Sequence, residues 1–340
     1  MGVTKPRAGL FPLALLLLAA CGGKEPATGE ADDIVVAAHP ELWPRIQARV
    51  KARLEPSQIT SGNLKSFEVS YLDPTTPEWE QQRLARQILL IGTAADPWME
   101  PVLDEPPPTP PLILEDSDVW AEGQSVTAVL LPEGDARAAV REQLDSLRNL
   151  YEQRYREYVV ERLFAEGTNQ AQADTLLEQF GFAVLAPSSW VSNGDGDVFV
   201  FRAPEDDSSN VIRQVTVTWR SPIPQGIQGD GLLAWRQLLA AEHFGIRQSV
   251  TLGNVDASQT THRGNVAYQL LGNWRNPQSG GPTRGPFMMR AIICPSQDRM
   301  YLVDGWLWAP DQEQHEYLVQ LESILNSFRC GSARASQPNE

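Results

Sequence analysis

The chain has 340 residues, of which 42% are hydrophobic, and a formal net charge of −15 at pH 7. This length and hydrophobic content suffice for about two packed domains. The acidic balance argues against a nucleic-acid partner and against electrostatic adhesion to anionic lipid, because both need clustered lysine and arginine.

An export signal is predicted at residues 1–20. Lys5 and Arg7 form a short basic region, and the apolar run from Leu10 to Ala20 is broken only by Pro12. This run is shorter than the about 20 apolar residues that a membrane-spanning helix needs. It fits the apolar core of a secretory signal peptide, whose removal takes the formal charge to −17.

The end of this run, Leu18-Ala19-Ala20-Cys21, resembles the lipobox of bacterial lipoproteins, in which the cysteine becomes the acylated N-terminus. The resemblance implies lipidation of Cys21 and a lipoprotein held in a membrane by palmitate-like acyl chains, since stable anchoring takes more than one chain. An ordinary cleaved signal that carries a cysteine is the alternative. Gly22, in place of an aspartate, favours the outer membrane, facing the periplasm. Residues 21–32 are predicted to be a flexible tether.

Residues 33–165 are predicted to form an N-terminal α/β domain. Short apolar or β-branched runs predict strands at residues 33–38, 67–72, 87–93 and 125–131. Leu42, Ile46, Val50 and Leu54 recur every four residues, as on an amphipathic helix, and a shorter helix is expected at 78–86. This alternation of strand and helix indicates an α/β layer.

Two segments of this domain have alternative interpretations. Five prolines within residues 104–111 predict an extended surface connection, or alternatively a proline-rich ligand for a partner domain. An apolar repeat of three or four residues predicts a long helix from about Glu133. It is interpreted as a helix lying across the sheet and leading into the second domain, with a coiled-coil dimer as the alternative.

Residues 166–330 are predicted to form a C-terminal α+β domain, an antiparallel sheet covered by helices. Strand patterns lie at residues 197–202, 211–219, 265–275, 286–294 and 300–308. Helical patterns lie at residues 169–180, 230–243 and 311–328. Gly181 stands where a glycine commonly ends a helix. Residues 331–340 are predicted to be a disordered tail.

No motif for catalysis or for metal or cofactor binding stands out. The four histidines, His39, His243, His262 and His315, have neither i, i+4 spacing nor an adjoining cysteine or carboxylate cluster. His315 is expected on a polar helix face. Residues 193–197 alternate like the first ligands of a calcium loop, but Val198 stands where that loop requires glycine, so a turn is favoured. No metal ion and no cofactor are predicted.

Tryptophans are concentrated in the second half of the chain. Trp306 and Trp308 are two residues apart, so they share one face of a strand, together with Asp304. With Trp274 they form a candidate binding face for a sugar, lipid or peptide. The alternative, and the commoner role of such a row, is core beneath a helix.

A disulfide between Cys294 and Cys330 is predicted. Once Cys21 is lipidated these two cysteines are left, and an exported protein meets an oxidising compartment. Cys294 ends a predicted strand and Cys330 ends the predicted closing helix, so the two sulfurs meet if that helix packs back on the sheet. Two separate thiols are the alternative.

Several motifs together resemble one family of bacterial lipoproteins, known as domain of unknown function 4837 (DUF4837). They are Asp118-Val-Trp120, Gly272-Asn-Trp274-Arg275, Gly285-Pro286-Phe287 and Gly305-Trp306-Leu307-Trp308. The resemblance covers nearly the whole mature chain, and it implies no activity, substrate or catalytic residue. The ending Ile324-Leu325-Asn-Ser-Phe328-Arg329 is more loosely similar to photosystem extrinsic-protein (PsbP) and Mog1-like domains, which implies a fold and a binding role.

The leading functional hypothesis is a lipid-anchored, periplasm-facing module without catalysis that binds or scaffolds an unknown envelope protein or small ligand. The alternative is an envelope hydrolase that acts on a cell-wall, lipid or glycan substrate at the domain junction. A deep pocket with a serine or carboxylate within reach of His243 or His262 would favour the hydrolase.

Overall fold

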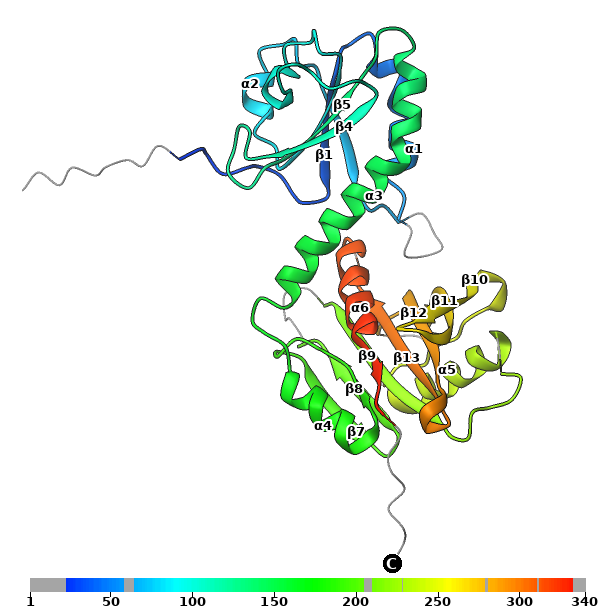
Figure 1. The fold of residues 1–340 in the computed structure, drawn as a ribbon. Helices are drawn as coiled ribbons and strands as arrows, with labels where there is room; N and C mark the ends of the chain where they lie inside the picture. The colour runs from blue at the N-terminus through cyan, green and yellow to red at the C-terminus, as the bar shows by residue number, and fades with distance from the viewer. Residues whose placement is uncertain are drawn as a thin grey trace, which may run out of the picture.

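The computed structural model describes residues 23–57, 64–204, 210–227, 229–278, 281–310 and 312–332. They form a mixed α+β structure in which one long helix joins two main sheets (Figure 1). The predicted fold class is confirmed. The predicted signal peptide and Cys21 lie outside the described residues, as does most of the predicted tail.

The N-terminal sheet has the strand order β2-β1-β3-β5-β4. Its strands are β1 (Asp33–Ala38), β2 (Glu68–Leu72), β3 (Gln87–Gly92), β4 (Leu112–Ser117) and β5 (Ser125–Leu130). All neighbours are parallel except β4, which runs antiparallel to β5. The sequence did not predict β4, because this edge strand has no buried side chain and therefore no apolar alternation.

Helices cover both faces of this sheet. Helices α1 (Trp43–Leu54) and α3 (Ala136–Leu163) lie on one face, and α2 (Trp79–Gln82) with the 3₁₀ turn η1 (Glu100–Val102) lies on the other. The predicted apolar stripe is the buried side of α1, where Ile46, Val50 and Leu54 contact the sheet. Helix α2 is shorter than the nine residues predicted.

Helix α3 links the two halves of the molecule. Its first turn is capped by Asp135, whose carboxylate accepts a hydrogen bond from the Ala138 N–H at 3.2 Å. Its 28 residues span roughly 42 Å. The helix therefore packs on α1 at one end and on α6 at the other (Figure 1), as the interpretation of a helix leading into the second domain requires.

The C-terminal sheet is antiparallel throughout, with the order β10-β11-β12-β13-β9-β8-β7. Its strands are β7 (Val191–Asp195), β8 (Val198–Arg202), β9 (Ile212–Arg220), β10 (Val255–His262), β11 (Asn265–Arg275), β12 (Arg284–Cys294) and β13 (Arg299–Trp308). The two edge strands, β7 and β10, are mostly exposed and were not predicted. The residues considered as a calcium loop form the β7–β8 hairpin, which turns at Gly196.

One helix covers each face of this sheet. Helix α5 (Gly229–His243) lies over the face that holds the tryptophans, and α6 (His315–Ser327) packs on β9 and β13 from the other side. Helix α4 (Gln170–Phe180) ends at Gly181, whose φ of 82° is left-handed, as predicted. Beside it, β6 (Phe182–Ala183) pairs with β14 (Arg329–Cys330). Two further 3₁₀ turns are η2 (Leu252–Asn254) and η3 (Pro295–Gln297).

The apolar core beneath α6 continues along α3 to the N-terminal sheet without a break. Tyr151 and Tyr155 of α3 join Phe67 on one side and Leu318 of α6 on the other in this cluster. Two domains were predicted, with a boundary near residue 165. Whether each half folds independently therefore stays a prediction.

Part of the predicted tether is attached to the N-terminal sheet. The Ala27 N–H donates to the Glu122 carbonyl at 2.8 Å, and the Glu122 N–H donates to the Glu25 carbonyl at 2.8 Å. The Arg86 N–H donates to the Thr28 carbonyl at 2.6 Å. Residues 25–28 are thus held by backbone hydrogen bonds, which a flexible tether would not have.

Candidate functional site at the junction of the two sheets

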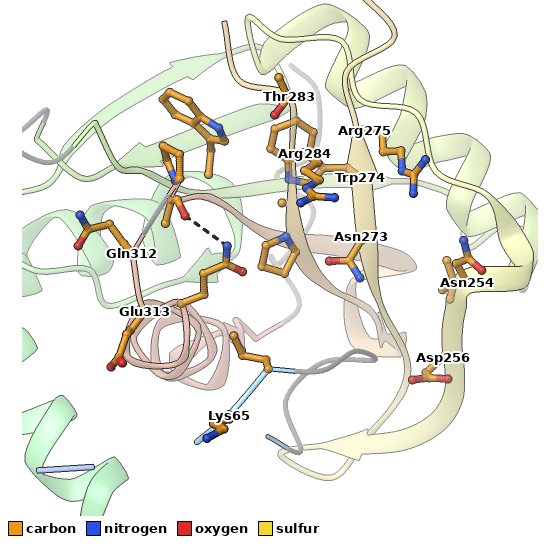
Figure 2. A pocket seen from close by; sticks show the side chains of 18 of the residues that line it. Lys65, Asn254, Asp256, Asn273, Trp274, Arg275, Thr283, Arg284, Gln312 and Glu313 are labelled. Carbon is orange, nitrogen blue, oxygen red and sulfur yellow. Dashed lines mark hydrogen bonds between the residues drawn. The ribbon is translucent and has the colours of Figure 1, made fainter. Parts of the chain in front are cut away.

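A cavity of about 1110 Å³ lies at the junction of the two halves. The segment 64–68 and Asp32 line it from the N-terminal half, and the ends of β11, β12 and β13 line it from the C-terminal half (Figure 2). Most of the side chains around it are polar or charged. A cavity of this size exceeds the usual range for a small-molecule site, so it has room for an extended polar ligand.

A pair of carboxyl groups crosses the junction at one wall of this cavity. Asp32 precedes β1, Glu313 precedes α6, and their side chains are hydrogen-bonded to each other. Burial, followed by this hydrogen bond and the charge of Glu313, raises the pKa of Asp32 to about 6. The pair therefore holds a proton at mildly acidic pH that an isolated aspartate would release.

His315 follows Glu313 by two residues in the sequence, and it is a packing residue. Its ring stacks on Tyr155 with centroids 5.2 Å apart, and its Nδ1 lies 3.3 Å from Ser57 Oγ. Burial, followed by the charges of Arg156 and Arg148, lowers the pKa of His315 to about 3, so the imidazole is neutral. The expectation that His315 lies on a polar helix face is wrong, because α3 covers that face of α6.

Two arginines occupy another part of the cavity wall. Arg275 ends β11 and Arg284 begins β12, and the two are direct cross-strand partners (Figure 2). Both side chains are exposed, and among the described residues no carboxylate lies within ion-pair distance of either guanidinium. Lys65, in contrast, lies 3.6 Å from Glu55 Oε2. The sequence did not predict this arginine pair, because the two residues meet only through the pairing of β11 with β12.

The predicted tryptophan binding face is largely core. Trp274 and Trp306 have no exposed surface and meet edge to face with centroids 5.7 Å apart beneath α5. Gly285 permits this close packing, since a Cβ at that position would stand 1.9 Å from the Leu307 carbonyl oxygen. The same carbonyl accepts a hydrogen bond from the Trp274 indole N–H at 3.2 Å. Trp308 is partly buried and lines the junction cavity. An open aromatic surface made by all three residues is therefore excluded.

The histidines named for a hydrolase do not meet its requirement. His262 Nε2 lies 2.7 Å from the Phe328 carbonyl, and burial lowers the pKa of this histidine. The adjoining cavity of about 330 Å³ is lined by His262 with Arg263, Arg290 and polar side chains, without a serine or carboxylate. His243, on α5, contacts the carboxylate of its neighbour Glu242 at 3.8 Å. Among the described residues, His243 lines neither cavity, and the cavity that His262 lines contains no serine or carboxylate.

The described residues contain no group of three or more histidine, cysteine, aspartate or glutamate side chains placed to hold a metal ion. None of the described helices has both the length and the apolar character that crossing a membrane requires.

Cys294 and Cys330 are joined by a disulfide, with their Cα atoms 6.1 Å apart. Cys294 ends β12, as expected from the strand pattern. Cys330 does not end the closing helix, because α6 stops at Ser327 and the chain then forms β14 against β6. The bond therefore links the large sheet to the small one.

The C-terminal half is thus an α+β domain in which an antiparallel sheet with one helix on each face contributes most of a polar cavity. Residues 169–327 match the family described as Domain of unknown function (DUF4837). The predicted family is confirmed over this range. No curated protein matches the chain.

Several solved structures resemble part of the chain. The Ran-binding protein Mog1p of Saccharomyces cerevisiae matches at 8% identity and a TM-score of 0.32, over 45% of this chain and 91% of its own. LpqN of Mycobacterium tuberculosis, described as involved in cell envelope biogenesis, matches at 14% identity and a TM-score of 0.26, over 43% of this chain and 79% of its own. A Bacteroides thetaiotaomicron protein matches at 12% identity and a TM-score of 0.26, over 47% of this chain and 48% of its own. Similarity this low carries no functional argument.

Proposed function

We propose that this chain is a lipid-anchored lipoprotein of the cell envelope, facing the periplasm, which binds a ligand in the cavity between its two sheets. The single observation that carries the proposal is the cavity itself, which has a volume of about 1110 Å³ and whose wall holds Arg275 and Arg284, two arginines with no described carboxylate within ion-pair distance. A polar cavity at the junction of two structural units is a common place for a binding site.

The anchor part of the proposal rests on the lipobox-like Leu18-Ala19-Ala20-Cys21. Only three residues lie between Cys21 and Glu25, and Glu25 is hydrogen-bonded to Glu122 beside the N-terminal sheet. Because an extended chain spans at most about 3.6 Å per residue, an acylated Cys21 would keep the N-terminal sheet within roughly 15 Å of the lipid surface. The lipoprotein would then hold its cavity close to the membrane.

Cys21→Ser is expected to abolish metabolic labelling with a fatty acid and to release the protein from the membrane fraction, because it removes the thiol that would carry the proposed acyl anchor. Cys330→Ser, which leaves Cys21 in place, is the matched control and should stay labelled. A Cys21→Ser protein that still sediments fully with membranes would show that the anchor assignment is wrong.

The binding part predicts a ligand that co-purifies with the protein. Mature protein extracted from envelopes in mild detergent is denatured, and the small molecules released are measured by mass spectrometry. Asn254→Trp, at the cavity wall, is expected to reduce the bound ligand at least 10-fold, because the indole occupies its space. Ser258→Trp, exposed on β10 outside the cavity, should retain it. Equal ligand in both variants would place the binding site elsewhere.

The hydrolase stays as a second proposal because of one observation, the hydrogen-bonded carboxyl pair Asp32–Glu313 in the same cavity. Two carboxyl groups that share a proton can act together as acid and base. Release of soluble fragments from purified cell wall or glycan would favour this function, whereas a binding module leaves these substrates intact.

A further inference from the structure

The two cavity arginines stand in an arrangement that costs energy unless something binds them. Like charges directly opposite each other on antiparallel strands are destabilising. Arg275 and Arg284 are such a pair, and no described carboxylate offsets them. Other arginines at the junction are paired, such as Arg156, whose guanidinium is hydrogen-bonded to the carboxylate of Glu322. The contacts described for the fold therefore do not explain why Arg275 and Arg284 stand opposite each other.

The backbone that carries these arginines is fixed on both sides. The Arg275 N–H donates to the Ser249 carbonyl at 2.9 Å, and the Ser249 N–H donates to the Arg275 carbonyl at 2.8 Å. Just beyond the pair, the Asn276 N–H donates to the Thr283 carbonyl at 2.8 Å. Strand β12 lies so close to Leu307 that only glycine fits at position 285. The two guanidinium groups thus extend from a fixed end of the sheet.

Two guanidinium groups on directly paired residues of neighbouring strands are suited to an oxyanion. Each presents a planar set of N–H donors that matches the two oxygens of a carboxylate or of a phosphate. Because both side chains are exposed to the cavity, they can reach an oxyanion without the cost of opening the core.

The remaining charges of the cavity distinguish between possible oxyanions. Four carboxyl groups also line it, namely those of Asp32, Glu68, Asp256 and Glu313. In Figure 2, Glu313 lies across the cavity from Arg275, and Asp256 lies below the arginines. A ligand with several phosphates would meet these acids with like charge. A ligand with one carboxylate and a neutral or ammonium-bearing remainder meets each wall with complementary charge.

We propose that the junction cavity binds a peptide-like ligand through its single free carboxylate, which Arg275 and Arg284 hold together. The carboxyl groups of the opposite wall accept the hydroxyl, amide or ammonium groups of the same ligand. This inference rests on the proposed binding function and specifies the chemistry of the ligand at that site.

The test uses the full mature chain in detergent, incubated with an equimolar mixture of random tripeptides that have free termini. Peptides retained by the protein are identified by mass spectrometry. A second mixture, amidated at the C-terminus, removes only the carboxylate. We expect at least 10-fold more retained peptide from the free-acid mixture than from the amides. Arg275→Gln/Arg284→Gln should lose this preference, whereas Arg247→Gln, an exposed arginine outside the cavity lining, should keep it.

In a third arm, inorganic phosphate, pyrophosphate and acetate are added separately as competitors of the bound peptides. Displacement of the peptides by pyrophosphate but not by acetate would assign the arginines to a phosphate ligand and overturn the inference. Equal retention of amides and free acids would also overturn it. So would an unchanged preference in the double variant, or no retained peptide at all. In each of these cases the co-purification experiment still tests the proposed binding function by itself. If Asn254→Trp loses the co-purified ligand, the cavity is a binding site and only the peptide-carboxylate inference has failed.

Discussion

Asp304→Asn is expected to lower the free energy of unfolding by about 3–5 kcal/mol, because it leaves a buried guanidinium without its counter-charge. Arg236 of α5 and Asp304 of β13 have no exposed side-chain surface. Their Nε and Oδ2 atoms are 2.6 Å apart, and a second contact joins Nη2 to Oδ1 at 3.4 Å. Burial raises the pKa of Asp304, and the charge of Arg236 opposes that rise.

The surroundings explain why the loss should be large. The Arg236 guanidinium carbon lies 3.9 Å from the Phe287 ring centroid, and one further hydrogen bond goes from Nη2 to Gln248 Oε1 at 2.8 Å. The rest of the cluster beneath α5 is apolar and includes Trp306. Asparagine can keep one hydrogen bond but cannot balance the charge, and water cannot enter without separating α5 from the sheet.

Urea unfolding of the Cys21→Ser protein, followed by tryptophan fluorescence, measures this loss. Glu80→Gln breaks the ion pair between Arg83 and the largely exposed carboxylate of Glu80, and should cost less than about 1 kcal/mol. Arg236→Met/Asp304→Leu removes both charges together and should recover most of the stability lost in Asp304→Asn. A loss below about 1 kcal/mol in Asp304→Asn would mean that the pair does not maintain the core.

Local patterns predicted those elements whose burial follows from their own sequence. The stripe of Ile46, Val50 and Leu54 is buried in α1, and Gly181 ends α4 with a left-handed φ. In both cases the determining interaction lies within a few residues along the chain. Edge strands lack such a signal: β10 reads Val-Asp-Ala-Ser-Gln-Thr-Thr-His and becomes a strand only because β11 offers unpaired backbone groups.

The candidate site could not be predicted in the same way. Asp32 and Glu313 are far apart in sequence and meet only because α3 brings the two sheets together. Asp304 did carry a usable signal, since a lone acid inside an apolar strand needs a buried partner. The sequence could not identify that partner as Arg236, because α5 could have covered either face of the sheet.

Loss of the disulfide is expected to lower the free energy of unfolding by roughly 3–4 kcal/mol, the chain-entropy value for cysteines 36 residues apart. Cys294 is buried at the end of β12, and Cys330 belongs to the two-residue strand β14. Such a short pairing contributes little by itself. Two hydrogen bonds also hold this segment: Gln297 Nε2 donates to the Gly331 carbonyl at 2.8 Å, and the Gly331 N–H donates to the Gly181 carbonyl at 2.8 Å. Both are lost if residues 329–331 separate from the sheet.

Urea unfolding with and without reductant separates the disulfide from other effects of substitution. Reductant should shift the Cys21→Ser protein to lower urea, and Cys294→Ala/Cys330→Ala should start at that lower midpoint and show no further shift. Because Cys294 is buried and alanine is smaller, a cavity adds to the loss in the variant, so the reductant shift is the cleaner measure of the disulfide. Two alkylatable thiols in protein purified without reductant, or a midpoint that reductant leaves unchanged, would contradict a stabilising bond between β12 and β14.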